Sequence, residues 1–142
     1  MRNARWTPAG LLSLLALLTA CAVFRTRGSD ETFPLVVNNR TTFDVTIFAV
    51  PYDGARTLIR LGDAHPGATT SIIVAKRALQ PQNILQLRVH AIGSARNVRS
   101  WQSQGETLDS TLAAALDLRA NPNGDLSKSS LYTMPRDLIR KP

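Results

Sequence analysis

The residues that could carry chemistry in this chain are few. It contains one cysteine and two histidines. A single cysteine can form neither an internal disulfide nor a cysteine-rich zinc site. Asp63 and His65 alternate at strand spacing and could present two metal ligands on one face, with His90 as a third. A simpler interpretation places Asp63 and His65 beside the Pro66-Gly67 turn and His90 on an exposed strand position, so we expect no metal and no cofactor.

Catalytic patterns are equally scarce. The sequence contains no Gly-x-Ser-x-Gly, no His-Glu-x-x-His and no phosphate-binding glycine loop. A serine hydrolase needs a histidine base, and neither histidine lies near a serine in a recognisable frame. Asp109 and Asp117 are too far apart in the sequence to be recognised as a carboxylate pair, and each fits an outward strand position. We therefore predict no catalytic residue and a protein that is not an enzyme.

The N-terminal segment has the pattern of a secretory signal peptide. Arg2 and Arg5 precede an apolar run over residues 11–20 that ends in small residues. A membrane-spanning helix needs about 20 apolar residues, roughly twice this length. The pattern therefore predicts a signal peptide over residues 1–20.

The tetrapeptide Leu18-Thr19-Ala20-Cys21 ends this run and contains the only cysteine. It resembles the lipobox of bacterial lipoproteins. The resemblance covers the first 21 residues and implies cleavage between Ala20 and Cys21, a diacylglyceryl thioether on Cys21, and usually acylation of its new amine. Two or three acyl chains hold a protein on a bilayer, whereas one gives only marginal binding. An alternative interpretation takes Ala20-Cys21-Ala22 as an A-x-A cleavage site, which would release a soluble periplasmic protein.

The sequence of residues 21–32 predicts a lipidated flexible stem, because charged residues are mixed with glycine and serine and the apolar residues show neither a helical nor a strand periodicity. Eleven residues span at most about 40 Å, so the domain should stay close to the bilayer. Ala22, rather than an aspartate, follows the cysteine. In enterobacterial lipoproteins, which this segment resembles, an aspartate at this position would favour retention in the inner membrane. Ala22 therefore implies location at the periplasmic face of the outer membrane.

Residues 33–134 show short apolar runs separated by turn residues at intervals near ten, which is typical of β-strands. Alternation is clearest over residues 43–50 and 84–92. In these two runs the predicted inward residues are Phe43, Val45, Ile47, Ala49, Leu85, Leu87, Val89 and Ala91. The other predicted strands cover residues 35–37, 56–61, 70–74, 97–101 and 130–134.

Residues 108–118 are ambiguous, since their apolar positions fit both a helical face and a strand; the surrounding β pattern favours a strand. Asp53-Gly54 predicts a tight hairpin turn. Asn39-Arg40-Thr41 matches a glycosylation sequon, but we expect these residues to form the hairpin between the first two strands. Residues 135–142 predict a frayed basic tail.

Seven or eight strands without βαβ alternation predict a mainly β protein, an immunoglobulin-like antiparallel β-sandwich. A small antiparallel β-barrel is the alternative. The cysteine pair of true immunoglobulin domains is missing. Arg56, Arg60-Leu61-Gly62, Pro66-Gly67 and Thr70 are similar to residues of small uncharacterised bacterial lipoproteins with sandwich domains, a resemblance that covers about 15 residues.

The chain is basic. The 17 Lys and Arg residues include Arg2 and Arg5, so the part after the signal has 15 against 10 acidic residues, a net charge near +5. A tethered exported protein does not meet nucleic acid, and basic and aromatic residues interleave only at Arg99 and Trp101. The positive charge could bind anionic lipid headgroups or cell-wall polymer. The alternative is that the basic side chains are solvated and have no partner.

These observations predict a membrane-tethered cell-envelope lipoprotein that binds or scaffolds another envelope component through its sandwich. Its partners would be the lipid bilayer, through acylated Cys21, and an envelope protein or cell-wall component, with no nucleic acid. The alternative is a cell-wall glycan or small-ligand binding module that uses Trp101, Tyr52 or Tyr132 as a stacking surface. A core position for Trp101 is the simpler interpretation.

Overall fold

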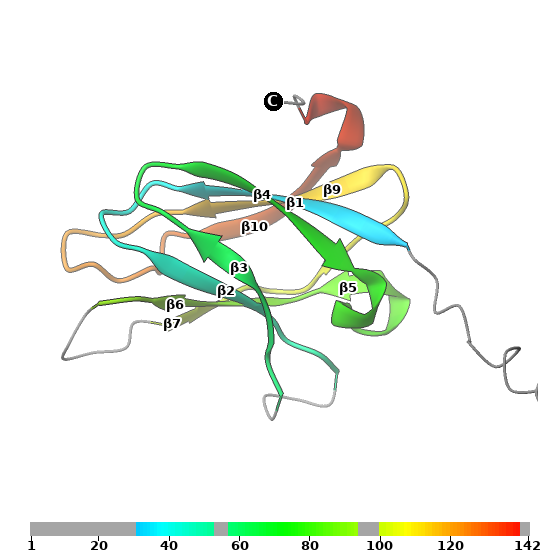
Figure 1. Ribbon diagram of the computed structural model, residues 1–142, viewed down its shortest axis with the longest axis horizontal. Coiled ribbons are helices and arrows are strands. Elements are labelled where there is room, and N and C mark those ends of the chain that lie inside the picture. The colour runs from blue at the N-terminus through cyan, green and yellow to red at the C-terminus, as the bar shows by residue number, and fades with distance from the viewer. Residues whose placement is uncertain (1–30, 53–56, 94–99, 140–142) are drawn as a thin grey trace, which may run out of the picture.

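The computed structural model describes residues 31–52, 57–93 and 100–139. These residues form two packed β layers and a small two-stranded ribbon (Figure 1). Ala20, Cys21 and the Asp53-Gly54 turn lie outside the described residues.

The first sheet has the strand order β10-β9-β1-β4. Its strands are β1 (Thr32–Asn39), β4 (Thr69–Ala75), β9 (Leu112–Leu118) and β10 (Ser130–Pro135). β1 runs parallel to β9 and antiparallel to β4, while β10 is antiparallel to β9. The parallel pair is a departure from the purely antiparallel arrangement that the sequence suggests.

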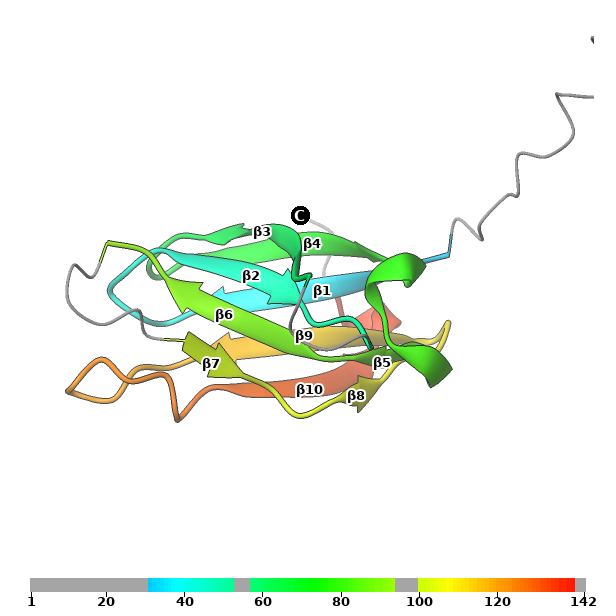
Figure 2. The ribbon, with the colours of Figure 1, turned by 90° about the horizontal axis from the view of Figure 1, so that it is seen from below.

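The second sheet has the order β3-β2-β6-β7, and β5 pairs with β8 in the separate ribbon. Their bounds are β2 (Val45–Ala49), β3 (Ile59–Ala64), β5 (Ile84–Leu85), β6 (Leu87–Ala91), β7 (Ser100–Gln102) and β8 (Glu106–Thr107). The described residues also form three short 3₁₀ turns: η2 (Lys76–Ala78) directly after β4, η3 (Pro81–Asn83) directly before β5, and η4 (Arg136–Leu138) directly after β10. Figure 2 shows β3 and β4 along one side of the molecule and β7, β8 and β10 along the other. The sheets do not close into a barrel, so the predicted β-sandwich is confirmed.

The core lies between the sheets and follows the predicted alternation. Leu35 of β1, Ile47 of β2 and Leu87 of β6 are completely buried. The other fully enclosed side chains include Phe33, Val37, Val45, Ala49, Val74, Leu85, Val89, Leu116 and Leu118. Phe43 packs against this core while remaining partly exposed.

The ambiguous segment is strand β9, and both of its faces are buried. On its outer face, Ala115 lies beside Val36 of β1 and Tyr132 of β10. Small alanine side chains in the centre of a sheet are covered by larger neighbours, so they are buried without facing the core. Asp117 lies two residues from Ala115 on the same outer face, as predicted, but the neighbouring strands leave it only 9% exposed.

Several connections also differ from the sequence interpretation. Asn39 does not begin a hairpin, because β1 and β2 belong to different sheets. The expected single strand over residues 84–92 breaks at Gln86, so that β5 pairs with β8 and β6 pairs with β2. The C-terminal segment remains part of the fold through η4, and Arg136 is half-buried.

Candidate functional site

The predicted lipidation and cleavage residues, Cys21 and Ala20, are not among the described residues. The chain enters the described fold at Glu31, whose backbone oxygen accepts a hydrogen bond from the Lys76 amide at 3.1 Å. The Lys76 ammonium also pairs with the Glu31 carboxylate. The entry of β1 is therefore attached to η2 by two contacts.

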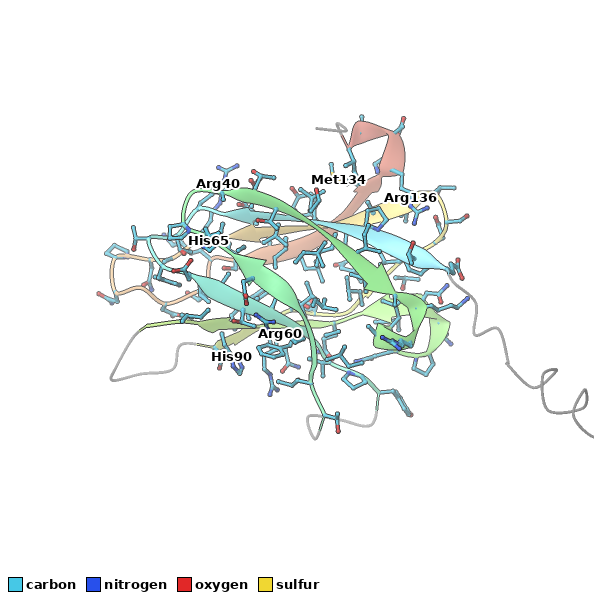
Figure 3. The ribbon with its side chains drawn as sticks, viewed as in Figure 1. Arg40, Arg60, His65, His90, Met134 and Arg136 are labelled. Carbon is cyan, nitrogen blue, oxygen red and sulfur yellow. The ribbon has the colours of Figure 1, made fainter. Side chains whose placement is uncertain are left out.

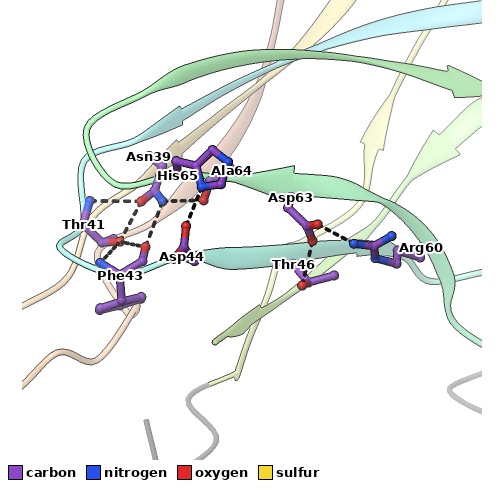
Figure 4. Close-up of polar contacts among 9 residues, drawn as sticks. All are labelled: Asn39, Thr41, Phe43, Asp44, Thr46, Arg60, Asp63, Ala64 and His65. Atoms are coloured by element: carbon purple, nitrogen blue, oxygen red, sulfur yellow. Dashed lines mark hydrogen bonds and ion pairs between the residues drawn. The ribbon is translucent and has the colours of Figure 1, made fainter. Parts of the chain in front are cut away.

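The three residues weighed as metal ligands do not converge. Asp63 accepts a hydrogen bond from the Thr46 hydroxyl at 2.8 Å and pairs with Arg60 (Figure 4). His65 Nδ1 lies 2.6 Å from an Asp44 oxygen. His90 packs its ring against Phe48, with centroids 5.1 Å apart. Within the described part of the chain, no group of three or more His, Cys, Asp or Glu residues could hold a metal ion.

Asn39 organises the loop that follows β1. Its side chain is buried, and its amide donates to the backbone oxygens of Phe43 at 3.0 Å and Ala64 at 2.9 Å. Its Oδ1 accepts from the Thr41 amide at 3.1 Å and the Thr41 hydroxyl at 2.7 Å (Figure 4). The sequon asparagine thus uses both amide hydrogens inside the fold, and it has none available for a glycan.

A charged cluster lies close to this loop, and the sequence did not predict it. The Asp117 carboxylate lies between two arginines: one oxygen is 3.2 Å from Arg40 Nε, and the other is 2.7 Å from an Arg119 terminal nitrogen. Arg40 also lines a groove of about 440 Å³ with Phe43 and Asn121. One carboxylate between two guanidinium groups gives these three residues a net positive charge.

The aromatic residues proposed for ligand stacking lie on separate surfaces. Trp101 of β7 is half-buried, packs against the core and lines a groove of about 350 Å³ between β7 and β10. The polar side chains around it are Gln102, Gln104, Glu106, Ser129 and Ser130. Tyr52 lies in the connection after β2, and Tyr132 lies on the outer face of the first sheet. Trp101 shares its groove with these five polar side chains, whereas Tyr52 lines a separate groove of about 290 Å³ with Gln80 and Gln82.

Several large apolar side chains are exposed on and beside the outer face of the first sheet. Ile73 of β4 is 66% exposed and Leu138 of η4 is 61% exposed. Met134 and Ile139 line a groove of about 260 Å³ on this face with Val36 and Leu138. The sequence held one signal for this surface, since Ile72 and Ile73 are adjacent and two neighbouring strand residues cannot both face the core.

Arg136 is held by the domain instead of extending into a tail. Its guanidinium group donates to the backbone oxygen of Leu112 at 3.2 Å and to that of Thr32. The same group lies over the ring of Phe33, 5.8 Å from its centroid. Figure 3 shows Arg136 and Arg40 near opposite ends of the first sheet.

Comparisons with protein-family models, with curated proteins and with solved structures found no match. None of the described residues form a helix that is long and apolar enough to span a bilayer.

Proposed function

We propose that this chain is a membrane-tethered lipoprotein of the cell envelope, anchored by acylated Cys21 at the periplasmic face of the outer membrane. The observation that carries the proposal is the sequence Leu18-Thr19-Ala20-Cys21, in which the only cysteine ends a ten-residue apolar run over residues 11–20. The following residues fit a short stem, and the first strand begins at Thr32.

The domain acts by binding or scaffolding another envelope component and not by catalysis. Three kinds of surface support this role: the loop end around Arg40 and Asp117, the Trp101 groove, and the apolar outer face of the first sheet. Loops and sheet edges of β-sandwiches commonly bind proteins or peptides.

Separation of inner and outer membranes on a density gradient tests the anchor. The full chain, expressed in a Gram-negative host, should be recovered with outer-membrane vesicles. Cys21→Ser should abolish this recovery, because serine has no thiol for the thioether. Recovery of the unchanged chain in the soluble periplasmic fraction would overturn the proposal in favour of cleavage after Ala22.

The Trp101 groove favours a second candidate function, the binding of a cell-wall glycan. An indole ring beside amide, hydroxyl and carboxylate groups can contact a sugar ring and bond its hydroxyls. Of the two tryptophans, Trp6 lies in the predicted signal peptide, so the fluorescence of the processed chain reports on Trp101 alone. Soluble peptidoglycan fragments should shift this fluorescence in a saturable way, and Gln104→Ala should weaken the binding. An unchanged spectrum at millimolar fragment would exclude this function.

A further inference from the structure

The outer face of the first sheet changes from polar to apolar along its strands. Near the loop that follows β1, Asn38 lies between Thr69 of β4 and Asp117 of β9. Four residues earlier on β1, Pro34 lies beside Ile73. Met134 of β10 lies beside Ala113 of β9, towards the same end of the sheet. The apolar part of the face is therefore the part nearer Thr32, where the chain enters the domain.

Three large apolar side chains stand out from this part of the face. Ile73, Tyr132 and Leu138 are 66%, 46% and 61% exposed, although they come from β4, β10 and η4. Figure 1 shows η4 above β10, at the end of the sheet where β1 begins. Large apolar side chains that gather on one surface from distant parts of a chain mark an interaction site.

Charged residues of both signs flank this apolar face. η2 follows β4 directly and carries two basic residues, one of them Lys76, and Arg136 begins η4. Acidic residues accompany them, since Glu31 pairs with Lys76, Asp137 follows Arg136, and the charge of Asp109 acts on Arg136. The exposed apolar side chains, and not a net charge, are therefore the feature that fits a lipid surface.

From this arrangement we propose that the outer face of the β10-β9-β1-β4 sheet lies against the bilayer that holds the anchor. Ile73, Tyr132 and Leu138 enter the boundary between headgroups and acyl chains, and the sheet is tilted so that the polar part of the same face, with Asn38 and Asp117, is lifted off the membrane. The inference rests on the proposed function, because the tether at Cys21 supplies the bilayer. Ten residues separate Cys21 from β1, so the reach of at most about 36 Å keeps this face within contact of the lipid.

Site-directed spin labelling of the tethered protein tests the orientation. Acylation blocks the only native thiol, so one introduced cysteine can be labelled in the full processed chain. Ile73→Cys and Leu138→Cys place the label on the proposed membrane face. Ser100→Cys is the control, because Ser100 is an exposed residue of the second sheet. Each variant is reconstituted in vesicles of phosphatidylethanolamine and phosphatidylglycerol and compared for collisions with oxygen, which concentrates in lipid, and with a water-soluble nickel complex.

Labels at residues 73 and 138 should show an oxygen-to-nickel collision ratio several-fold above that at residue 100. Equal, water-exposed ratios at all three positions, with the protein still bound to the vesicles, would overturn the orientation and leave the proposed anchor standing. If the labels at residues 73 and 138 lost collisions with both oxygen and nickel as the protein density in the vesicles rose, the face would be assigned to contact with a second copy of the chain. Failure of the processed chain to stay with the vesicles would overturn the proposed function and this inference together.

Discussion

At the scale of single residues, buried and capping polar groups fix the connections between strands. Asn39 is only 1% exposed and bonds to Thr41, Phe43 and Ala64. It thereby joins the end of β1 to the end of β3 in the opposite sheet. Asp109 has a comparable local role at the surface, where it accepts hydrogen bonds from the Thr111 amide at 2.7 Å and hydroxyl at 2.6 Å.

Asn39→Asp should destabilise the domain. The substitution keeps one acceptor oxygen but removes the N–H donors to the Phe43 and Ala64 backbone oxygens. The Phe43 oxygen still accepts from the Thr41 hydroxyl, whereas the buried bond to the Ala64 oxygen is lost, at a cost on the order of 1–3 kcal/mol. Urea unfolding should show this loss, while Thr42→Ala, at a neighbouring exposed position, should leave the midpoint nearly unchanged. A wild-type midpoint for Asn39→Asp would contradict the network.

Asp109 should make stability depend on pH. The hydrogen bonds from Thr111 lower the pKa of the Asp109 carboxyl below its ordinary value. A lowered folded-state pKa contributes stability above the ordinary pKa of about 3.9, and this stability is lost as the pH falls through the folded-state value. The midpoint difference between the wild type and Asp109→Asn should therefore shrink between pH 7 and pH 2. A midpoint difference that stays constant over this pH range would show that the charge of the Asp109 carboxylate does not contribute to the stability of the fold.

At the scale of elements, the strands with one buried face were predictable from their own alternation, whereas β9 was predicted as a strand only from the β pattern around it. Alternation in β2 and β6 predicted Ile47 and Leu87 as inward residues, since a strand with one solvated face repeats every two residues. β9 has no such alternation because both of its faces are buried. Its parallel pairing with β1 joins segments far apart in the chain, and that pairing decides the burial of Asp117. The apolar outer face likewise depends on three distant segments, and the adjacent Ile72 and Ile73 are its one local signal in the sequence.

Substitutions in β2 and β6 should follow the assigned faces. Leu87→Ala and Ile47→Ala remove completely buried side chains and should each cost about 2–5 kcal/mol through lost burial and a residual cavity. Thr46→Ala removes one partly exposed hydrogen bond to Asp63 and should cost about 1 kcal/mol. Equilibrium urea unfolding gives the ranking, and the reverse order would mean that the strand faces are misassigned.

The contacts of η4 predict a structural role for Arg136. Arg136→Ala removes the hydrogen bonds to Thr32 and Leu112 and should cost on the order of 1–2 kcal/mol. Arg136→Lys keeps the charge but cannot reproduce both bonds of the guanidinium fork, so it should restore only part of the loss. Arg77→Ala removes an exposed positive charge nearby and serves as the control. Equal midpoints for the Arg136→Ala and Arg77→Ala variants would show that Arg136 acts only as surface charge.

At the scale of the whole molecule, the proposed tether precedes a sandwich that has an apolar surface and a charged surface. The apolar face lies towards the start of β1, and the charged loop around Arg40 and Asp117 lies towards the opposite end of the first sheet (Figure 3). An anchored domain with this arrangement can rest on lipid and still present its loops to a partner in the envelope. The sandwich predicted from the sequence is confirmed, the anchor at Cys21 stays a prediction, and the relation between them depends on the folded arrangement.

The mass of the mature N-terminal peptide tests the central claim most directly. The protein is purified from membranes of a Gram-negative host and digested, and the N-terminal peptide is analysed by mass spectrometry. The account predicts a peptide that begins at Cys21 and carries a diacylglyceryl group, with or without a further acyl chain on its amine. An unmodified peptide beginning at Val23 would contradict the anchor and make the protein a soluble periplasmic one.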